Sequence, residues 1–201
     1  DVVASLYQRN HLYDFIKKFS TKIFVPMTLG GGLRDINGIH KALNSGADKV
    51  FFNSSILKTP SLIKKFSEIF GSQCIVISIE AKKIDEDYYC YYNSGRENSK
   101  RKISEWISET EDLGCGELLI NSIDKDGTKK GFDLKLTELV MKIANRPVII
   151  SGGAGKIDDV LNLAKEFNPS GICLSSALHY KMFTIQQLKE QLRILKLKYV
   201  R

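Results

Sequence analysis

Short apolar runs alternate with amphipathic segments along the chain. Six runs have the composition of strands, and they cover residues 23–29, 48–53, 73–80, 116–121, 146–151 and 170–176. Apolar residues at helical spacing predict helices at 11–20, 35–46, 61–71, 102–114, 134–145, 156–167 and 184–196. Most of the strands are apolar on both faces, which is typical of a parallel sheet covered by helices. Both an open doubly wound sheet and a (β/α)8 barrel fit this order.

The segment 82–101 interrupts the alternation. Its first part, KIDEDYYCYYN, predicts a hairpin, and the polar stretch SGRENSKR follows it. We expect the tyrosines at 88–92 to cover one face of the hairpin, with a substrate lid as the alternative.

A repeated module favours the barrel. The segments VPMTLGGGLRD (25–35) and RPVIISGGAGKID (146–158) both read proline, apolar residues, adjacent glycines and an acid, and Gly31 corresponds to Gly152. Adjacent glycines after a strand let backbone N–H groups approach an anion without interference from a Cβ atom. Each segment therefore has the sequence of a phosphate cradle, although a tight turn alone also explains either one.

The next strand in each half supports the same interpretation. Residues 48–57, DKVFFNSSIL, and residues 170–179, SGICLSSALH, each join a strand to two small hydroxyl residues. Ser54–Ser55 and Ser175–Ser176 can donate to the same phosphate oxygens as the glycine segments. Two cradles on opposite sides of one barrel would hold a ligand with a phosphate at each end. The repetition therefore predicts a (β/α)8 TIM barrel of the phosphate-binding type.

The segment SIDKDGTKKGFD (122–133) follows a strand and is rich in aspartate and glycine. A calcium loop is one alternative, but the closing glutamate is missing at the required spacing. A plain turn does not explain Asp124 directly at the end of a strand. We therefore expect one lip of an anion site, in which the backbone N–H groups of Asp126–Gly127 face a phosphate. Asp124 would face the reacting centre or order a neighbour.

The composition fits one globular domain covering residues 1–201. A net charge of +7 is spread over scattered lysine pairs, which favours attraction of small anions over nucleic-acid binding. The four cysteines match neither a metal-ligand spacing nor a disulfide framework, so we expect reduced thiols in a cytoplasmic protein. No apolar stretch is long enough to cross a membrane. Neither a metal nor a cofactor is expected.

Several segments closely resemble the cyclase subunit of imidazole glycerol phosphate synthase, a family of phosphate-binding barrels in histidine biosynthesis. They are LGGGLRD, GADKVFFNSS, FGSQCIVISIEAKK, GCGELLINSIDKDGTKKGFD, RPVIISGGAGK and SSALHY, and the resemblance runs from Asp1 to about Lys189. It implies a full barrel with its active site at the carboxyl ends of the strands.

The resemblance also implies a reaction. Such a lyase uses ammonia from a glutaminase subunit docked at the bottom of the barrel. The substrate would be the bis-phosphorylated ribulosyl-formimino aminoimidazole carboxamide ribonucleotide. The products would be imidazole glycerol phosphate and an aminoimidazole carboxamide ribotide.

Site residues are assigned by the same resemblance. The first phosphate would be bound by Gly32, Asn53 and Ser54. The second would be bound by the backbone of Asp126–Gly127, by Gly152 and Gly153, and by Ser175–Ser176. Other positions around the reacting centre would be the catalytic Glu80, Ser151, and Asp1 at the end of the second strand. The barrel floor, where ammonia enters, would carry Lys49 and Glu117, with Asp48 at the glutaminase contact.

Three departures accompany the resemblance. About fifty residues of a typical barrel, with the first strand and one of two catalytic aspartates, are absent before Asp1, so we expect an N-terminally incomplete barrel. The other catalytic aspartate falls at Glu80, which adds a methylene, and a carboxylate displaced by ~1 Å can lower a rate about a hundredfold. The loop SGRENSKRKISEW lacks a threonine–glycine pair of the family.

Three functions therefore compete. The first is the histidine-pathway cyclase, with acid–base catalysis by Glu80 and an aspartate upstream of Asp1. The second is a paralogous barrel that, with a glutaminase, delivers ammonia to an amidotransferase making surface-sugar amidines. The third is a non-catalytic scaffold that activates a glutaminase. Glu80 and the altered loop make the second a serious rival.

Overall fold

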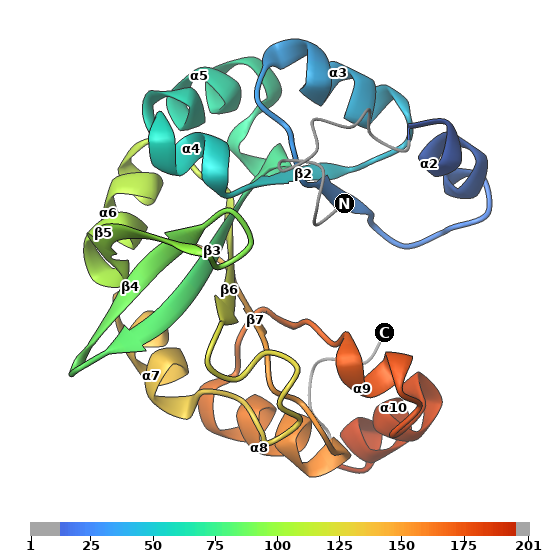
Figure 1. The fold of residues 1–201 in the computed structure, drawn as a ribbon. Helices are drawn as coiled ribbons and strands as arrows, with labels where there is room; N and C mark the ends of the chain where they lie inside the picture. The colour runs from blue at the N-terminus through green and yellow to red at the C-terminus, as the bar shows by residue number, and fades with distance from the viewer. Residues whose placement is uncertain (1–12, 196–201) are drawn as a thin grey trace.

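The computed structural model describes residues 13–195 and arranges them as a curved parallel sheet with helices on its outer side (Figure 1). Six parallel strands follow one another in the order β1-β2-β3-β6-β7-β8. Their bounds are β1 Thr28–Gly30, β2 Lys49–Phe52, β3 Ile75–Ile84, β6 Glu117–Ser122, β7 Val148–Ser151 and β8 Gly171–Ile172. A doubly wound sheet would carry helices on both faces. The fold is therefore of the (β/α)8 barrel class, as predicted.

Helices cover the outer face of the sheet, between successive parallel strands, before the first strand and after the last. They are α2 Tyr13–Ser20, α3 Ile36–Asn44, α4 Ser54–Lys58, α5 Ser61–Phe70, α6 Ile103–Asp112, α7 Leu134–Ile143, α8 Ile157–Phe167, α9 Ser176–His179 and α10 Ile185–Ile194. Polar side chains cap the first turns of α3 and α7. Asp35 accepts from the Gly38 N–H at the start of α3, and Asp133 accepts from the Leu136 N–H at the start of α7. No helix among residues 13–195 is long and apolar enough to span a membrane.

The predicted elements differ from the structure mainly at the ends of the sheet. The run 23–29 contributes only the short β1, and the side chains of Phe24 and Val25 before it are 93% and 70% exposed. Pro26, which follows Val25 and precedes β1, has no N–H to donate to a sheet. The short helices α4 and α9 were not expected, because five or fewer residues carry too little periodicity to be recognised.

Alternation along the strands separates the outer core from the inner face of the sheet. On β2, Val50 and Phe52 belong to the main hydrophobic core, and the Phe52 ring stacks on Phe66 of α5 at 5.2 Å between centroids. Lys49 and Phe51 therefore point to the inner face. The register that pairs β3 with β6 and β6 with β7 carries this inner face across the sheet.

The segment 82–101 forms a three-stranded antiparallel excursion that projects from the sheet (Figure 1). β3 continues to Ile84 and pairs with β4 Asp87–Tyr92, which confirms the predicted hairpin, and β4 pairs with β5 Glu97–Lys102. The stretch after the tyrosines was expected as a loop, but its second half is β5. Asn93, Ser94 and Gly95, at the tip of the hairpin that β4 and β5 form, all have positive φ, at 52°, 59° and 72°.

Candidate active site

A cavity of about 570 Å³ opens on the inner face of the sheet, at the carboxyl ends of the strands. Seven residues predicted from the sequence line it, namely Gly32, Asn53, Ser54, Glu80, Asp126, Ser151 and Ser175. They come from loops and strand ends that are far apart in the chain. The carboxyl ends of parallel strands meet at one edge of the sheet, and this topology brings the residues together.

Glu80 is the carboxylate nearest the middle of this arrangement. It lies opposite Asn121 in the register of β3 and β6, and Asn121 lies opposite Ser151 in β7. Its Oε2 atom accepts from Asn53 Nδ2 at 2.8 Å and from the Gly95 N–H at 2.9 Å. Burial raises the pKa of Glu80, and the two hydrogen bonds partly offset the effect. A carboxyl with a raised pKa can exchange protons closer to neutral pH.

The first predicted cradle lies beside Glu80. Gly31 and Gly32 follow β1 with φ of 95° and 68°, a conformation that other residues rarely adopt. Both line the cavity together with Ser54, whose Oγ atom accepts from the Asn93 N–H at 3.0 Å. Arg34 also lines the cavity, so the surface around the glycines carries positive charge.

The second predicted cradle is packed more tightly. Gly152 and Gly153, with φ of 92° and 109°, are both buried. A Cβ atom at Gly153 would overlap the carbonyl oxygen of Gly131, whose own N–H donates to the Gly153 oxygen at 2.9 Å. Ser175 lines the cavity, whereas Gly127, Gly152, Gly153 and Ser176 do not. Their part in binding a phosphate stays a prediction.

The segment 122–133 is held by its own aspartates. Asp124 accepts from the Lys83 N–H at 2.8 Å, so it orders a neighbouring strand, which was one of the two expected roles. The Asp126 N–H donates to the Ser122 oxygen at 2.8 Å, and the Asp126 carboxylate lines the cavity. The Asp126 N–H, one of the two backbone donors predicted here, therefore already has an acceptor, and the role of the Gly127 N–H stays a prediction.

The amino-terminal end of the inner face carries an ion pair. Lys49 Nζ lies 2.9 Å from Glu117 Oε2, and the two side chains are 33% and 17% exposed. Phe51 and Leu119 lie two residues further along the same strands and form part of the cavity wall. Asp48, the predicted partner contact, is exposed and accepts from the Met27 N–H at 2.7 Å. Asp1 lies outside the described residues.

Sequence reasoning missed several lining residues. Phe51 and Ser78 lie two residues before Asn53 and Glu80, and Leu119 and Asn121 lie two and four residues after Glu117, so period-two spacing along each strand would have found them. Asn93 and Ser94 also line the cavity. The residues Asn-Ser-Gly at the hairpin tip indicated a loop, but they did not show that this loop lies against the cavity.

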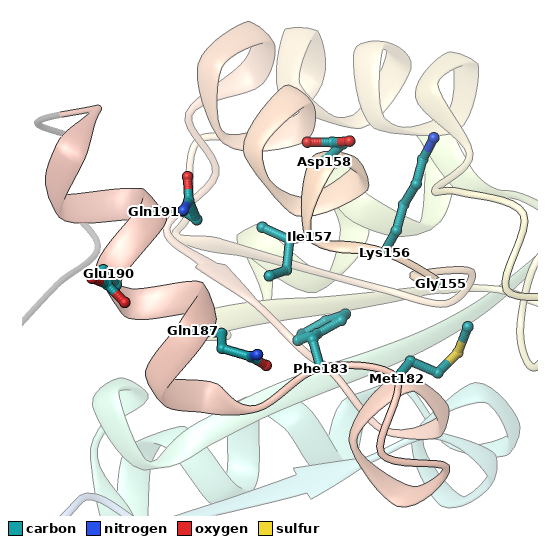
Figure 2. Close-up of a pocket in the computed structure, with 9 residues that line it drawn as sticks. All are labelled: Gly155, Lys156, Ile157, Asp158, Met182, Phe183, Gln187, Glu190 and Gln191. Atoms are coloured by element: carbon teal, nitrogen blue, oxygen red, sulfur yellow. The ribbon is translucent and has the colours of Figure 1, made fainter.

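A second cavity, of about 550 Å³, lies between α8 and α10 (Figure 2). Ile157, Phe183 and Gln187 converge on it, and Lys156 and Asp158 lie at its edge. No residue predicted from the sequence lines this cavity. Within residues 13–195, no group of three or more histidine, cysteine, aspartate or glutamate side chains gathers as a metal site would require.

The fold and the carboxylate-bearing cavity at its strand ends are those of an enzyme of the (β/α)8 barrel class. Residues 1–184 match the model of the family described as histidine biosynthesis protein. The chain belongs to this family.

Three relatives are each named imidazole glycerol phosphate synthase subunit HisF. The protein from Hydrogenobaculum sp. is 45% identical over 194 residues, which are 96% of this chain and 77% of the relative. The protein from Prochlorococcus marinus (strain AS9601) is 42% identical over 192 residues, 94% of this chain and 75% of the relative. The protein from Campylobacter concisus is 42% identical over 193 residues, 96% and 76% of the two chains. These comparisons confirm the predicted family and enzyme class, and the word subunit in each name points to a partner chain for those proteins.

Proposed function

We propose that the chain is the cyclase part of imidazole glycerol phosphate synthase. It would convert the bis-phosphorylated ribulosyl-formimino aminoimidazole carboxamide ribonucleotide into imidazole glycerol phosphate and an aminoimidazole carboxamide ribotide. Ammonia would come from a glutaminase partner. The observation that carries the proposal is Glu80, a half-buried carboxylate with a raised pKa at the centre of a cavity flanked by two glycine–serine segments.

The two flanking segments suit the two ends of such a substrate. Gly32 and Ser54 border the cavity on the β1–β2 side, and Ser151 and Ser175 border it on the β7–β8 side. A ligand with a phosphate at each end would then lie across Glu80 with its reacting atoms in the middle. Hydroxyl and backbone donors at both ends would hold the phosphates.

The route for ammonia would begin at the opposite end of the inner face. Lys49 and Glu117 lie there, and Ser78 and Glu80 follow on β3 towards the strand ends. The inner wall between these two levels includes Phe51 and Leu119, whose apolar side chains offer no proton to a neutral amine. A glutaminase docked near Asp48 would deliver ammonia to this end.

The proposal is tested with the full-length protein and an ammonium salt in place of the glutaminase. We expect ammonium-dependent turnover of the bis-phosphate substrate, followed by chromatography of the two products. Glu80→Gln, which keeps the shape but cannot exchange the proton, should lower kcat at least about 100-fold. No turnover by the unmodified protein, together with stimulation of a glutaminase, would contradict the proposal.

One observation favours a second candidate, the paralogous barrel that supplies ammonia for surface-sugar amidines. Position 80 is a glutamate where the resemblance implies an aspartate, and its Oε2 atom accepts from the Gly95 N–H at the hairpin tip. A barrel devoted to ammonia delivery would bind glutaminase and pass ammonia to a third protein without converting the bis-phosphate. The same turnover assay separates the two candidates.

A further inference from the structure

Asn53 stands at the N-cap of α4 but does not cap it. Asparagine is among the favoured residues at this position, because its side-chain oxygen accepts from the first free N–H groups of a helix. In this chain the Asn53 side chain makes no such bond. Its Nδ2 atom instead donates to Glu80 Oε2 at 2.8 Å, across from β2 to β3. The Asn53 side chain therefore binds a residue of the next strand instead of capping its own helix.

Glu80 Oε2 is bound from two sides. The Asn53 amide approaches from β2, and the Gly95 N–H at the hairpin tip approaches at 2.9 Å. Both bonds fall on the same oxygen, and Oε1 receives none from the described part of the chain. A glutamate has one more rotatable bond than an aspartate, and two donors on one oxygen remove that freedom.

The Oδ1 atom of Asn53 does not suit a phosphate. It is buried and has no hydrogen-bond partner among residues 13–195. This oxygen accepts hydrogen bonds, as phosphate oxygens do at neutral pH, so the two would repel. One of the two N–H groups on Nδ2 already donates to Glu80, which leaves a single side-chain donor for any ligand.

We propose that Asn53 is a positioning residue for Glu80, which together with the Gly95 N–H fixes Oε2 so that Oε1 faces the cavity as the proton-exchanging atom. The inference rests on the proposed function, in which Glu80 is the reacting carboxylate. It also assigns to the hairpin tip the role of completing the site and of accommodating the longer side chain of a glutamate.

The proposal has a consequence for proton affinity that a phosphate ligand would lack. The Asn53 amide stabilises the ionised form of Glu80 and thereby lowers its pKa against the effect of burial. Removing this donor should raise the pKa of Glu80 further. A residue that only binds a phosphate would change substrate affinity and leave the proton affinity of Glu80 alone.

The first experiment compares Asn53→Ala with Ser175→Ala in the full-length protein with ammonium salt. In Asn53→Ala we expect kcat to fall about 100-fold, KM to change less than about threefold, and the acid limb of the pH profile to move to higher pH. Ser175→Ala should raise KM without moving that limb. A raised KM and an unmoved limb in Asn53→Ala would overturn the proposal and favour a phosphate ligand.

The second experiment does not depend on turnover. Carbon-13 NMR of the Glu80 carboxyl, assigned with Glu80→Gln, would follow its titration in the unmodified protein and in the isosteric Asn53→Asp. Aspartate keeps the shape and can cap α4, but it replaces the donor with a like charge, so the pKa of Glu80 should rise. An unchanged titration would overturn the positioning role even if the cyclase reaction were confirmed. Absence of turnover with a raised pKa would instead count against the proposed function alone.

Discussion

Lys49 of β2 and Glu117 of β6 form an ion pair of 2.9 Å that spans the intervening strand β3. With Glu117 only 17% exposed, the loss of its partner would leave a carboxylate poorly solvated. Lys49→Met should therefore lower the free energy of unfolding by about 1–3 kcal/mol in urea denaturation. Glu117→Leu added to Lys49→Met should recover part of the loss. Equal stability of the single variant and the unmodified protein would show that the pair is fully screened by solvent.

The raised pKa of Glu80 predicts how stability depends on pH. A carboxyl that holds its proton more tightly when folded contributes stability at low pH, and this contribution is lost as pH rises through the folded pKa. Glu80→Gln keeps an oxygen that can accept from Asn53 and Gly95 but carries no charge. The Tm of Glu80→Gln should therefore rise relative to the Tm of the unmodified protein as pH increases. A constant Tm difference across pH would contradict a raised pKa.

Two glycines with positive φ should respond differently to alanine. At Gly153, with φ of 109°, an added Cβ would overlap the Gly131 oxygen, and Gly153→Ala should cost at least about 2 kcal/mol. At Gly127, with φ of 71°, an added Cβ meets nothing within 4 Å, and Gly127→Ala should cost about 1 kcal/mol. Chemical denaturation of both variants measures the difference. Similar losses would mean that the loop at Gly131 moves easily.

Asp133 collects three donors at the start of α7. Tyr88 OH, Ser122 Oγ and the Leu136 N–H lie 2.9 Å, 3.1 Å and 3.1 Å from its oxygens. Asp133→Ala should cost about 2–4 kcal/mol because it removes a helix cap and leaves the buried Ser122 without its acceptor. Tyr88→Phe removes one donor only and should cost about 1 kcal/mol. The ratio of the two losses, measured by denaturation, tests whether Asp133 joins the hairpin to α7.

The four cysteines are free thiols with different surroundings. Cys90 and Cys115 are buried, and burial raises their pKa to about 12 and about 11. Cys173 is exposed, so it should react first with a thiol reagent in the native protein, with Cys173→Ser removing this fast phase. The two buried thiols should react only after denaturation. Rapid reaction of all four would indicate an opened core.

The sequence was sufficient for the parallel sheet and for the polar residues on both sides of the cavity. Glycine pairs, hydroxyl residues and an acid stand directly after strands, and parallel topology gathers strand ends at one edge, so Gly32, Ser54, Glu80 and Ser175 could be placed together in advance. The repeat of residues 25–35 at 146–158 was informative because it can be recognised in the amino-acid sequence without a structure.

The hairpin tip could not be placed in the same way. Its contacts with Glu80 and Ser54 arise from the length and twist of two antiparallel strands, and neither leaves a periodic signal in the sequence. The hydrogen bond from Asn53 to Glu80 could not be predicted for a related reason. An asparagine after a strand and before a helix suits a cap, and only the neighbouring strand in space shows its actual partner.

Strand β3 carries Glu80 and pairs with β4, and β4 leads directly into the tip at residues 93–95, so the tip returns to the reacting carboxylate from the adjacent strand. Lengthening β4 and β5 by two residues each would carry the tip about 7 Å away from the carboxylate and leave the parallel sheet unchanged. Insertions and deletions in β4 and β5 would therefore change the surroundings of the carboxylate in a related barrel without changing its parallel sheet.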